Sequence, residues 1–421
     1  TINKEERNEL LHRMTDEVAA LVLRNNYLQS QAVSAEAAHA PERLDSHARL
    51  MRTLERRGQL DREVEGLPSE DELIERANAG QGMTRPEISV LLAHAKMSLN
   101  DGLLESDVPE DSHLGDDLML YFPAPLRAEH VGGIEGHRLR REIIATSVAN
   151  SLVNRAGVCF VTEVVEERLC GQGDVARAYL AARNVNQLRR SWQTIEALDN
   201  KIASDVQLDM FGEFHKLLTH HTMWLLSNRP RPLDVSRAIA DFGTGVAELE
   251  GVIETVLSPA GLANMGARQT KFGKTGVPDK LARLVASVEA MIPACDIVEV
   301  ARQSELSVPT TAAVYFQLGA RFNLEWLRDG AQPLLAGDHW QHRAVAAIIE
   351  DLYSQQRALC RTVLVASEGS APEDAVENWV ADNEGVFERA TALFEDLRSA
   401  GALDLAKLAL ANRHMRELIV A

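Results

Sequence analysis

The stretch TRPEISVLLAHAKMSLN, from Thr84 to Asn100, carries the clearest structural pattern in the sequence. It starts with a hydroxyl residue that can cap a helix, a proline suited to the first helical turn, and a glutamate three residues after the cap. The stretch therefore predicts an amphipathic helix that begins close to residue 84. Its apolar residues recur at the i, i+3, i+4, i+7 and i+11 spacing of one buried helix face: Ile88, Leu91, Leu92, Ala95 and Leu99.

The same helical period recurs in four further regions of the chain, residues 11–28, 175–195, 281–292 and 345–359. Asp338 precedes the last of them and is predicted to cap that helix. Runs of alternating β-branched residues between turn signals are missing, apart from the short stretch 158–165, which a helix explains equally well. The sequence thus predicts an all-α fold, a multi-helix array of two or three packed helical segments without a substantial sheet.

Turn-forming residues interrupt the helical pattern at residues 66–69, 132–133, 229–232, 258–278 and 367–372. The longest of these breaks, 258–278, holds several glycines and three basic residues, and we expect a segment boundary or an ordered surface loop there. A chain of 421 residues is also too long for one hydrophobic core of ordinary size. We therefore predict a first helix over residues 1–30, a helical segment over 31–260 and a C-terminal helical segment over 261–421.

The charge balance and the apolar pattern argue against two classes of function, nucleic-acid binding and membrane binding. The formal net charge is −18, from 62 acidic and 44 basic residues, and such a surface repels nucleic acid and anionic lipid. No stretch approaches the roughly 18 consecutive apolar residues of a membrane-spanning helix, and residues 1–9 are too polar for a signal peptide. We expect a cytoplasmic protein that binds neither nucleic acid nor a membrane.

The four cysteines, Cys159, Cys170, Cys295 and Cys360, form no CxxC pair. They lie in apolar or helical contexts, and this placement suits reduced core thiols better than a disulfide framework or a zinc site.

Two glycine-containing stretches resemble nucleotide-binding motifs but lack the spacing that these motifs require. Phe242-Gly243-Thr244-Gly245 has neither a third glycine at the dinucleotide-binding offset nor a preceding strand, so we expect a helix interruption there. Gly273-Lys274-Thr275 is similar to the end of a P-loop, but six residues instead of four separate Gly266 from Gly273. Neither stretch predicts a nucleotide site.

The remaining polar groups also lack the spacing of an active site. Five histidines lie in two clusters, but no carboxylate or cysteine stands at a spacing that would complete a metal site with either cluster. Histidines that are hydrogen-bonded at the surface or at an interface explain these clusters better than metal ligands do. Adjacent carboxylates, as at 116–117, 166–167 and 350–351, diverge by about 100° on a helix and cannot act together on one substrate atom. The GxSxG pattern is absent. The sequence therefore predicts no catalytic, cofactor-binding or metal-binding residue. The histidines in question are His215, His220, His221, His339 and His342.

Asn25-Asn26-Tyr27, preceded by Arg24, is the most unusual polar run, because it interrupts an apolar stripe. A helix C-terminus explains it, since asparagine tolerates a left-handed turn. A docking contact, or a contact between segments, is the alternative.

Several ordered blocks of the sequence resemble one family. Residues 14–29, MTDEVAALVLRNNYLQ, are similar to the segment that follows the catalytic domain in large bacterial NAD-dependent glutamate dehydrogenases. Residues 82–93 resemble the family's "LTRPE" helix, 121–123 its "YFP" turn and 137–146 its "HRLRREIIAT" helix. The resemblance runs from end to end and continues in shorter blocks at residues 153–157, 195–199, 314–316 and 339–340.

The resemblance implies the C-terminal helical portion of an enzyme that converts L-glutamate, NAD+ and water to 2-oxoglutarate, ammonium and NADH. It also implies a cytoplasmic homo-oligomer whose catalytic residues and NAD site lie upstream, so that this segment alone is inactive and binds no cofactor. Its partner would be the catalytic domain of the same polypeptide, which it would serve in assembly or regulation. Two alternatives stay open: a helical module with its own small-molecule site, and an interaction scaffold unrelated to dehydrogenases.

Overall fold

The computed structural model describes residues 3–336, 339–367 and 371–420. Within these residues the chain forms 22 α-helices and three short 3-10 helices and has no strand, which confirms the all-α prediction. The helices group into two compact units. Unit 1 comprises Thr1–Arg183 with Thr222–Arg237, and unit 2 comprises Asn184–His221 with Ala238–Ala421. The predicted ranges 1–30, 31–260 and 261–421 stay predictions.

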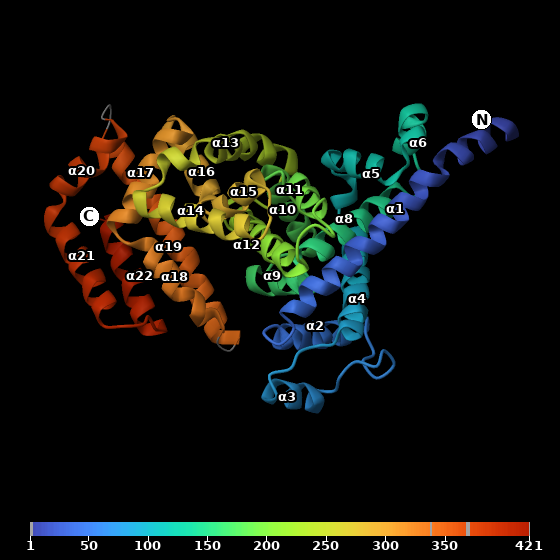
Figure 1. Cartoon of the computed structure of the whole chain (residues 1–421), viewed down its shortest axis with the longest axis horizontal. Coiled ribbons are helices and arrows are strands. Elements are labelled where there is room, and N and C mark those ends of the chain that lie inside the picture. The colour runs from blue at the N-terminus through green and yellow to red at the C-terminus, as the bar shows by residue number, and fades with distance from the viewer. Residues whose placement is uncertain (1–2, 337–338, 368–370, 421) are drawn as a thin grey trace. The chain divides into compact units, whose positions relative to one another are not determined.

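Unit 1 contains the N-terminal helices (Figure 1). Helix α10 ends at the border with unit 2, and the last turns of α12 also belong to unit 1. The elements are α1 (Lys4–Ala38), α2 (Leu44–Arg56), α3 (Glu70–Asn78), α4 (Arg85–Leu104), η1 (Val108–Glu110), η2 (Ser112–Leu114), α5 (Gly115–Tyr121), α6 (Ala124–Glu129), α7 (Val131–Glu135), α8 (Arg140–Ala156), α9 (Phe160–Arg168) and α10 (Gln172–Val185).

The centre of unit 1 is the packing of α4 on α8, and α1 lies against both of them (Figure 1). Leu91 and Leu99 of α4 and Ile144 and Leu152 of α8 are all fully buried or nearly so. Burial of an aliphatic side chain of this size stabilises a fold by about 1.5–3 kcal/mol. As the sequence predicts, α4 begins directly after Thr84, whose backbone N–H donates to the Glu87 carboxylate at 2.7 Å.

Unit 2 holds the remaining helices, with α19 in contact with α16, α17, α20 and α22. The side chains of Val345, Leu352, Leu359 and Val363 give α19 a fully buried face. The elements are α11 (Leu188–Glu196), α12 (Ser204–Asn228), α13 (Val235–Val256), α14 (Pro259–Lys274), α15 (Asp279–Met291), α16 (Ala294–Ser304), α17 (Val308–Arg321), α18 (Leu324–Ala331), η3 (Gln332–Ala336), α19 (His339–Ala366), α20 (Pro372–Asp382), α21 (Glu384–Ser399) and α22 (Leu405–Val420).

Several expected breaks are helical in the structure. The stretch 258–278 contains α14, which begins because the Ser258 hydroxyl accepts a hydrogen bond from the Gly261 N–H at 3.1 Å. Residues 132–133 belong to α7, and 242–245 lie inside α13. The stretch 158–165, which the sequence left open between a strand and a helix, lies largely in α9. The expected loops at 66–69 and 229–232 are confirmed. Asp338 lies outside the described residues.

The polar run at residues 24–27 does not end a helix, because α1 continues to Ala38. The Tyr27 hydroxyl accepts a hydrogen bond from the Gln31 side chain one turn later, at 3.0 Å, and the Arg24 guanidinium lies 5.9 Å from the centre of the Tyr27 ring. These side chains interact along the helix surface, so the run is compatible with an uninterrupted helix.

No single helix among the described residues is long and apolar enough to cross a membrane. Helices α8 and α9 would meet that criterion as a pair, by length and composition only, with a bend of 91° between them.

Candidate functional site

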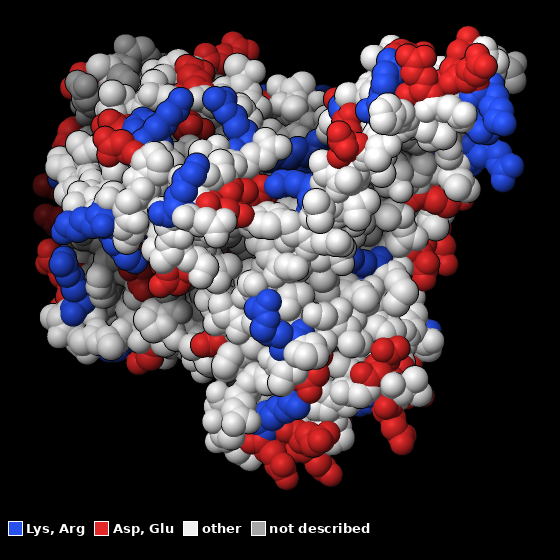
Figure 2. All heavy atoms as spheres, turned by 45° about the vertical axis from the view of Figure 1, so that its right-hand side comes forward, with Lys and Arg blue, Asp and Glu red and all other residues white. Residues whose placement is uncertain are grey.

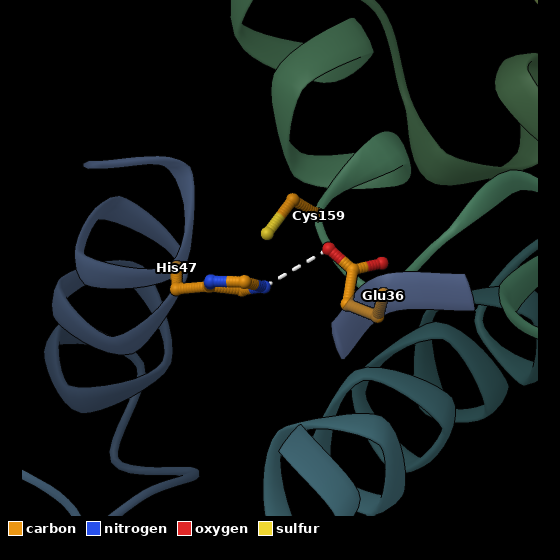
Figure 3. A group of neighbouring side chains, drawn as sticks. All are labelled: Glu36, His47 and Cys159. Atoms are coloured by element: carbon orange, nitrogen blue, oxygen red, sulfur yellow. Dashed lines mark hydrogen bonds and ion pairs between the residues drawn. The ribbon is translucent and has the colours of Figure 1, made fainter. Parts of the chain in front are cut away.

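A buried polar cluster lies at the C-terminal end of α1 in unit 1. It brings together Glu36 from the last turn of α1, His47 from α2 and Cys159, which directly precedes α9 (Figure 3). All three residues are buried, although polar side chains seldom occupy such positions without partners. We call these three residues, with Arg43 and Glu163, the junction cluster.

Glu36 is the centre of the junction cluster. Its Oε1 accepts a hydrogen bond from His47 Nε2 at 2.9 Å and pairs with Arg43 Nε at 3.0 Å. Its Oε2 lies 3.5 Å from the backbone N–H of Val158. Because a carboxylate only accepts hydrogen bonds, the bond to Glu36 assigns the donating hydrogen of His47 to Nε2. The other ring nitrogen, Nδ1, is buried and has no hydrogen-bond partner among the described residues.

The backbone before Cys159 takes a form that favours glycine. Gly157 has φ of 96°, in the left-handed region. A Cβ at this position would lie 3.1 Å from Glu36 Oε2. Gly157 thus lets the chain turn closely past Glu36 and present the next N–H to it.

The charges of the junction cluster balance around Glu36. Burial alone would raise the pKa of Glu36, but the hydrogen bond from His47 and the positive charge of Arg43 lower it to about 2. Arg43 also pairs with Glu163 at 3.7 Å. Burial, followed by the charge of Glu163, raises the pKa of Cys159 well above its usual range, so this thiol stays protonated. The junction cluster is therefore an ion-pair network with a neutral thiol.

A carboxylate, an imidazole and a thiol are all ligands of zinc, and the ligand atoms of Glu36, His47 and Cys159 lie within 4.8 Å of one another. The Arg43 guanidinium, however, already supplies the positive charge next to Glu36. The arrangement fits a structural junction of three helical elements better than a metal centre.

The N-terminal half of α1 is held to α6 by a second group of polar contacts. Arg13 makes a two-pronged pair with Glu129, at 2.8 and 2.9 Å. Both carboxylate oxygens of Glu17 accept from the backbone N–H of Ala124, the first residue of α6, at 2.9 Å. Exposed pairs of this kind add little stability, so their main effect is to fix the position of α6 on α1.

The same half of α1 exposes apolar side chains. Leu11, Val18 and Val22 are 52, 43 and 55% exposed, and their spacing of seven and eleven residues places them on one side of the helix. By contrast, Ala32 and Val33, near the other end of α1, are buried in unit 1. Helix α1 thus has a buried C-terminal part and an exposed apolar N-terminal part.

The histidines singled out in the sequence do not form a common site. His221 is fully buried, and it accepts a hydrogen bond from the Asn186 amide at 2.8 Å and donates one to the Ile292 carbonyl at 3.1 Å. His342 lies 2.9 Å from the Leu335 carbonyl. The structure supplies these two side chains with protein partners, as the interpretation of satisfied histidines expects.

Sequence reasoning missed the junction cluster, although one signal for it was present. Glu36 follows the buried Ala32 and Val33 at four and three residues, and His47 precedes the buried Leu50 and Met51 by three and four. An ionisable residue in a core position of a helical pattern indicates a buried pair. The spacing does not show which residues pair, because residues 36, 47 and 159 meet only in the folded chain.

Comparison with known proteins gives two family matches. Residues 80–417 match the family "Glutamate dehydrogenase, C-terminal". Residues 1–36 match the family "Bacterial NAD-glutamate dehydrogenase, catalytic domain". The second match ends at Glu36, the centre of the junction cluster.

Three proteins named NAD-specific glutamate dehydrogenase are similar to nearly the whole chain. The one from Pseudomonas aeruginosa is 38% identical over 418 residues, the one from Halomonas elongata 36% over 420, and the one from Mycobacterium tuberculosis 32% over 419. Each alignment covers 99% of this chain and 26% of the relative. The chain therefore spans about a quarter of the length of the curated relatives that it matches.

Proposed function

Because the chain belongs to the family of glutamate dehydrogenase C-terminal regions, we propose that it is a non-catalytic helical module of an NAD-dependent glutamate dehydrogenase. In this proposal the longer polypeptide oxidises L-glutamate with NAD+ and water to 2-oxoglutarate, ammonium and NADH. NAD binds to the catalytic domain of that polypeptide and not to this module. The assembled enzyme is a cytoplasmic homo-oligomer, and the module supports the catalytic domain mechanically.

The observation that carries this proposal is that α1 matches the catalytic-domain family and is at the same time anchored in unit 1. The helix has 35 residues and is about 50 Å long at 1.5 Å per residue. The match to the catalytic-domain family covers α1 almost to its end and stops at Glu36, while the junction cluster fixes Glu36 to α2 and to the residues before α9. A continuous helix that matches the catalytic-domain family and is also anchored in unit 1 would transmit position between the catalytic domain and this module.

A module with its own small-molecule site receives less support. A cavity in unit 2 has a volume of about 30 Å³, room for about one water molecule, whereas ligand sites usually measure about 300–1,000 Å³. Its lining includes Asn186, Ser287 and Glu250 but no arginine, histidine or aspartate. The family match also removes the reading as a scaffold unrelated to dehydrogenases.

The first test compares NADH formation from L-glutamate by the isolated chain and by the same chain joined to its native upstream sequence. We expect activity only in the longer protein. Turnover by the isolated chain would mean that an active site lies within these 421 residues.

The second test asks whether the catalytic domain depends on the junction cluster. In the longer protein, Glu36→Gln should lower the temperature at which NADH formation is lost, by about 2–4 °C for each kcal/mol of stability removed. Glu42→Gln is the matched control, since Glu42 lies nearby, in the short connection that follows α1, but is exposed. If unit 1 unfolds early in the Glu36 variant while the enzyme keeps its full NADH rate, the module gives no mechanical support and the proposal is wrong.

A further inference from the structure

Nearly half of the exposed large apolar side chains of the described residues lie in two short segments of unit 1. One segment is residues 11–23 of α1, and the other is residues 115–139, which contains α5, α6 and α7. Single exposed apolar residues need no explanation, but such a concentration indicates a binding surface. We call residues 115–139 the crown. Its exposed apolar side chains are Leu120, Tyr121, Val131 and Leu139, each between 42 and 54% exposed.

The two segments are joined to each other. The Arg13–Glu129 pair and the bonds from Glu17 to α6 connect the exposed half of α1 directly to the crown. A buried ion pair also fixes the crown to α10. Asp117 pairs with Arg183 of α10 at 3.3 Å, and Arg183 is only 1% exposed. The apolar side chains therefore sit on an ordered base and not on a loose loop.

The middle of α1 carries almost no charge of its own. Between Val18 and Ala35, Arg24 is the single charged residue, although a quarter of the whole chain is charged. Figure 2 shows the contrast on one face of unit 1, where charged side chains gather at the N-terminal end of α1 and over α3 but are sparse between these places. On α1, this depletion of charge beside the exposed Val18, Val22 and Leu23 is typical of the core of a protein interface.

We propose that the exposed half of α1 and the crown form one docking surface for the body of the catalytic domain that precedes α1 in the longer polypeptide. This inference rests on the proposed function, because it requires the module to be joined to that domain. Two observations favour this occupant. The exposed apolar stripe of α1 lies inside the residues that match the catalytic-domain family, and the matched relatives are about four times as long as this chain. The crown lies outside that match and would be the module's own contribution to the interface.

The test is amide hydrogen exchange, which reports burial of each segment without reference to activity. We compare the isolated chain with the longer polypeptide at several protein concentrations. We expect residues 18–26 and the crown to exchange at least tenfold more slowly in the longer polypeptide, independently of concentration. Equal exchange rates of the crown in the two proteins would overturn the proposal. Protection that appears in the isolated chain as its concentration rises would assign the surface to a second copy of this chain and would overturn it as well.

A pair of variants makes the test specific. Leu120→Asp places a charge in the crown, and Leu262→Asp places one at an exposed leucine of unit 2; the two leucines are 50 and 43% exposed. Because both side chains are exposed, neither change should alter the melting temperature of the isolated chain. In the longer polypeptide, Leu120→Asp should remove the protection of both segments, while Leu262→Asp should leave it intact. Protection that survives Leu120→Asp would refute the docking surface, whereas the effect of Glu36→Gln on activity would still test the proposed function separately.

Discussion

Glu36→Gln should destabilise the isolated chain by about 3 kcal/mol at pH 7, because a lowered pKa measures how strongly the fold favours the ionised carboxylate. The pKa of Glu36 falls from 4.5 to about 2 on folding, and each pKa unit corresponds to about 1.4 kcal/mol. The side chain is only 4% exposed, so solvent screening reduces this figure little. Glutamine keeps the shape of the side chain but leaves the Arg43 charge without its buried partner, which generally costs about 3–5 kcal/mol.

The pH dependence gives this prediction a distinct signature. The folded pKa lies below the unfolded one, so the stabilisation is complete above about pH 4.5 and is lost as the pH falls toward about 2. The stability difference between the natural chain and Glu36→Gln should therefore shrink from about 3 kcal/mol at pH 7 to about 2 kcal/mol at pH 3.5. Urea unfolding of unit 1, followed by hydrogen exchange of α2 and α9, measures that difference, with Glu42→Gln as the control.

Two results would refute this reasoning. One is a Glu36→Gln chain that is as stable as the Glu42→Gln chain at pH 7. The other is a stability difference that stays constant between pH 7 and pH 3.5, because the carboxylate would then not be the group that stabilises the junction.

Unit 2 supplies two further predictions. Gly245→Ala in α13 should lower stability by about 1–3 kcal/mol, because a Cβ there would meet Val298 at 2.9 Å. Gly251→Ala in the same helix has open space around the new Cβ and should raise stability by up to about 1 kcal/mol. Urea unfolding of both variants checks the two opposite changes in stability. Burial lowers the pKa of His221 to about 4, so the unfolded chain takes up a proton that the folded chain excludes, and stability should fall between pH 6.5 and pH 4. A His221→Gln chain that loses as much stability over this range as the natural chain would contradict that assignment.

The helical pattern of the sequence predicted the elements whose local signals agree with one another. In α4 the N-cap threonine, the first-turn proline and the apolar period all indicate the same start, and the structure places it there. The expectation of a surface loop was wrong at α14, because we gave the glycines more weight than the helix-start signal of Ser258 followed by Pro259. Ser258 caps the helix and Pro259 opens it, so the glycines lie within a helix whose start was encoded next to them.

Two polar features that involve α1, the asparagine pair and the junction cluster, could not be predicted correctly from the sequence. Asn25 and Asn26 suggested a helix end, but packing at both ends of α1 keeps the helix continuous, since Met14 and Val33 are both buried. Tertiary contacts of this kind override the weak local preference of asparagine. The junction cluster was beyond reach for a related reason, because Cys159 is distant in sequence from Glu36 and only the packing of α1, α2 and α9 brings them together.

At Glu36 the boundary given by the family matches differs from the boundary given by the packing of the chain. The catalytic-domain match ends at this residue, and the C-terminal match begins at residue 80. Physically, however, the last two turns of α1 belong to unit 1, because Ala32, Val33 and Glu36 are buried in it and Glu36 is held by His47 and Arg43. A cut directly after the catalytic-domain match, at Glu36, would remove the carboxylate and leave the buried His47 and Arg43 without this acceptor. It follows that α1 is a structural part of unit 1, whatever else it contacts.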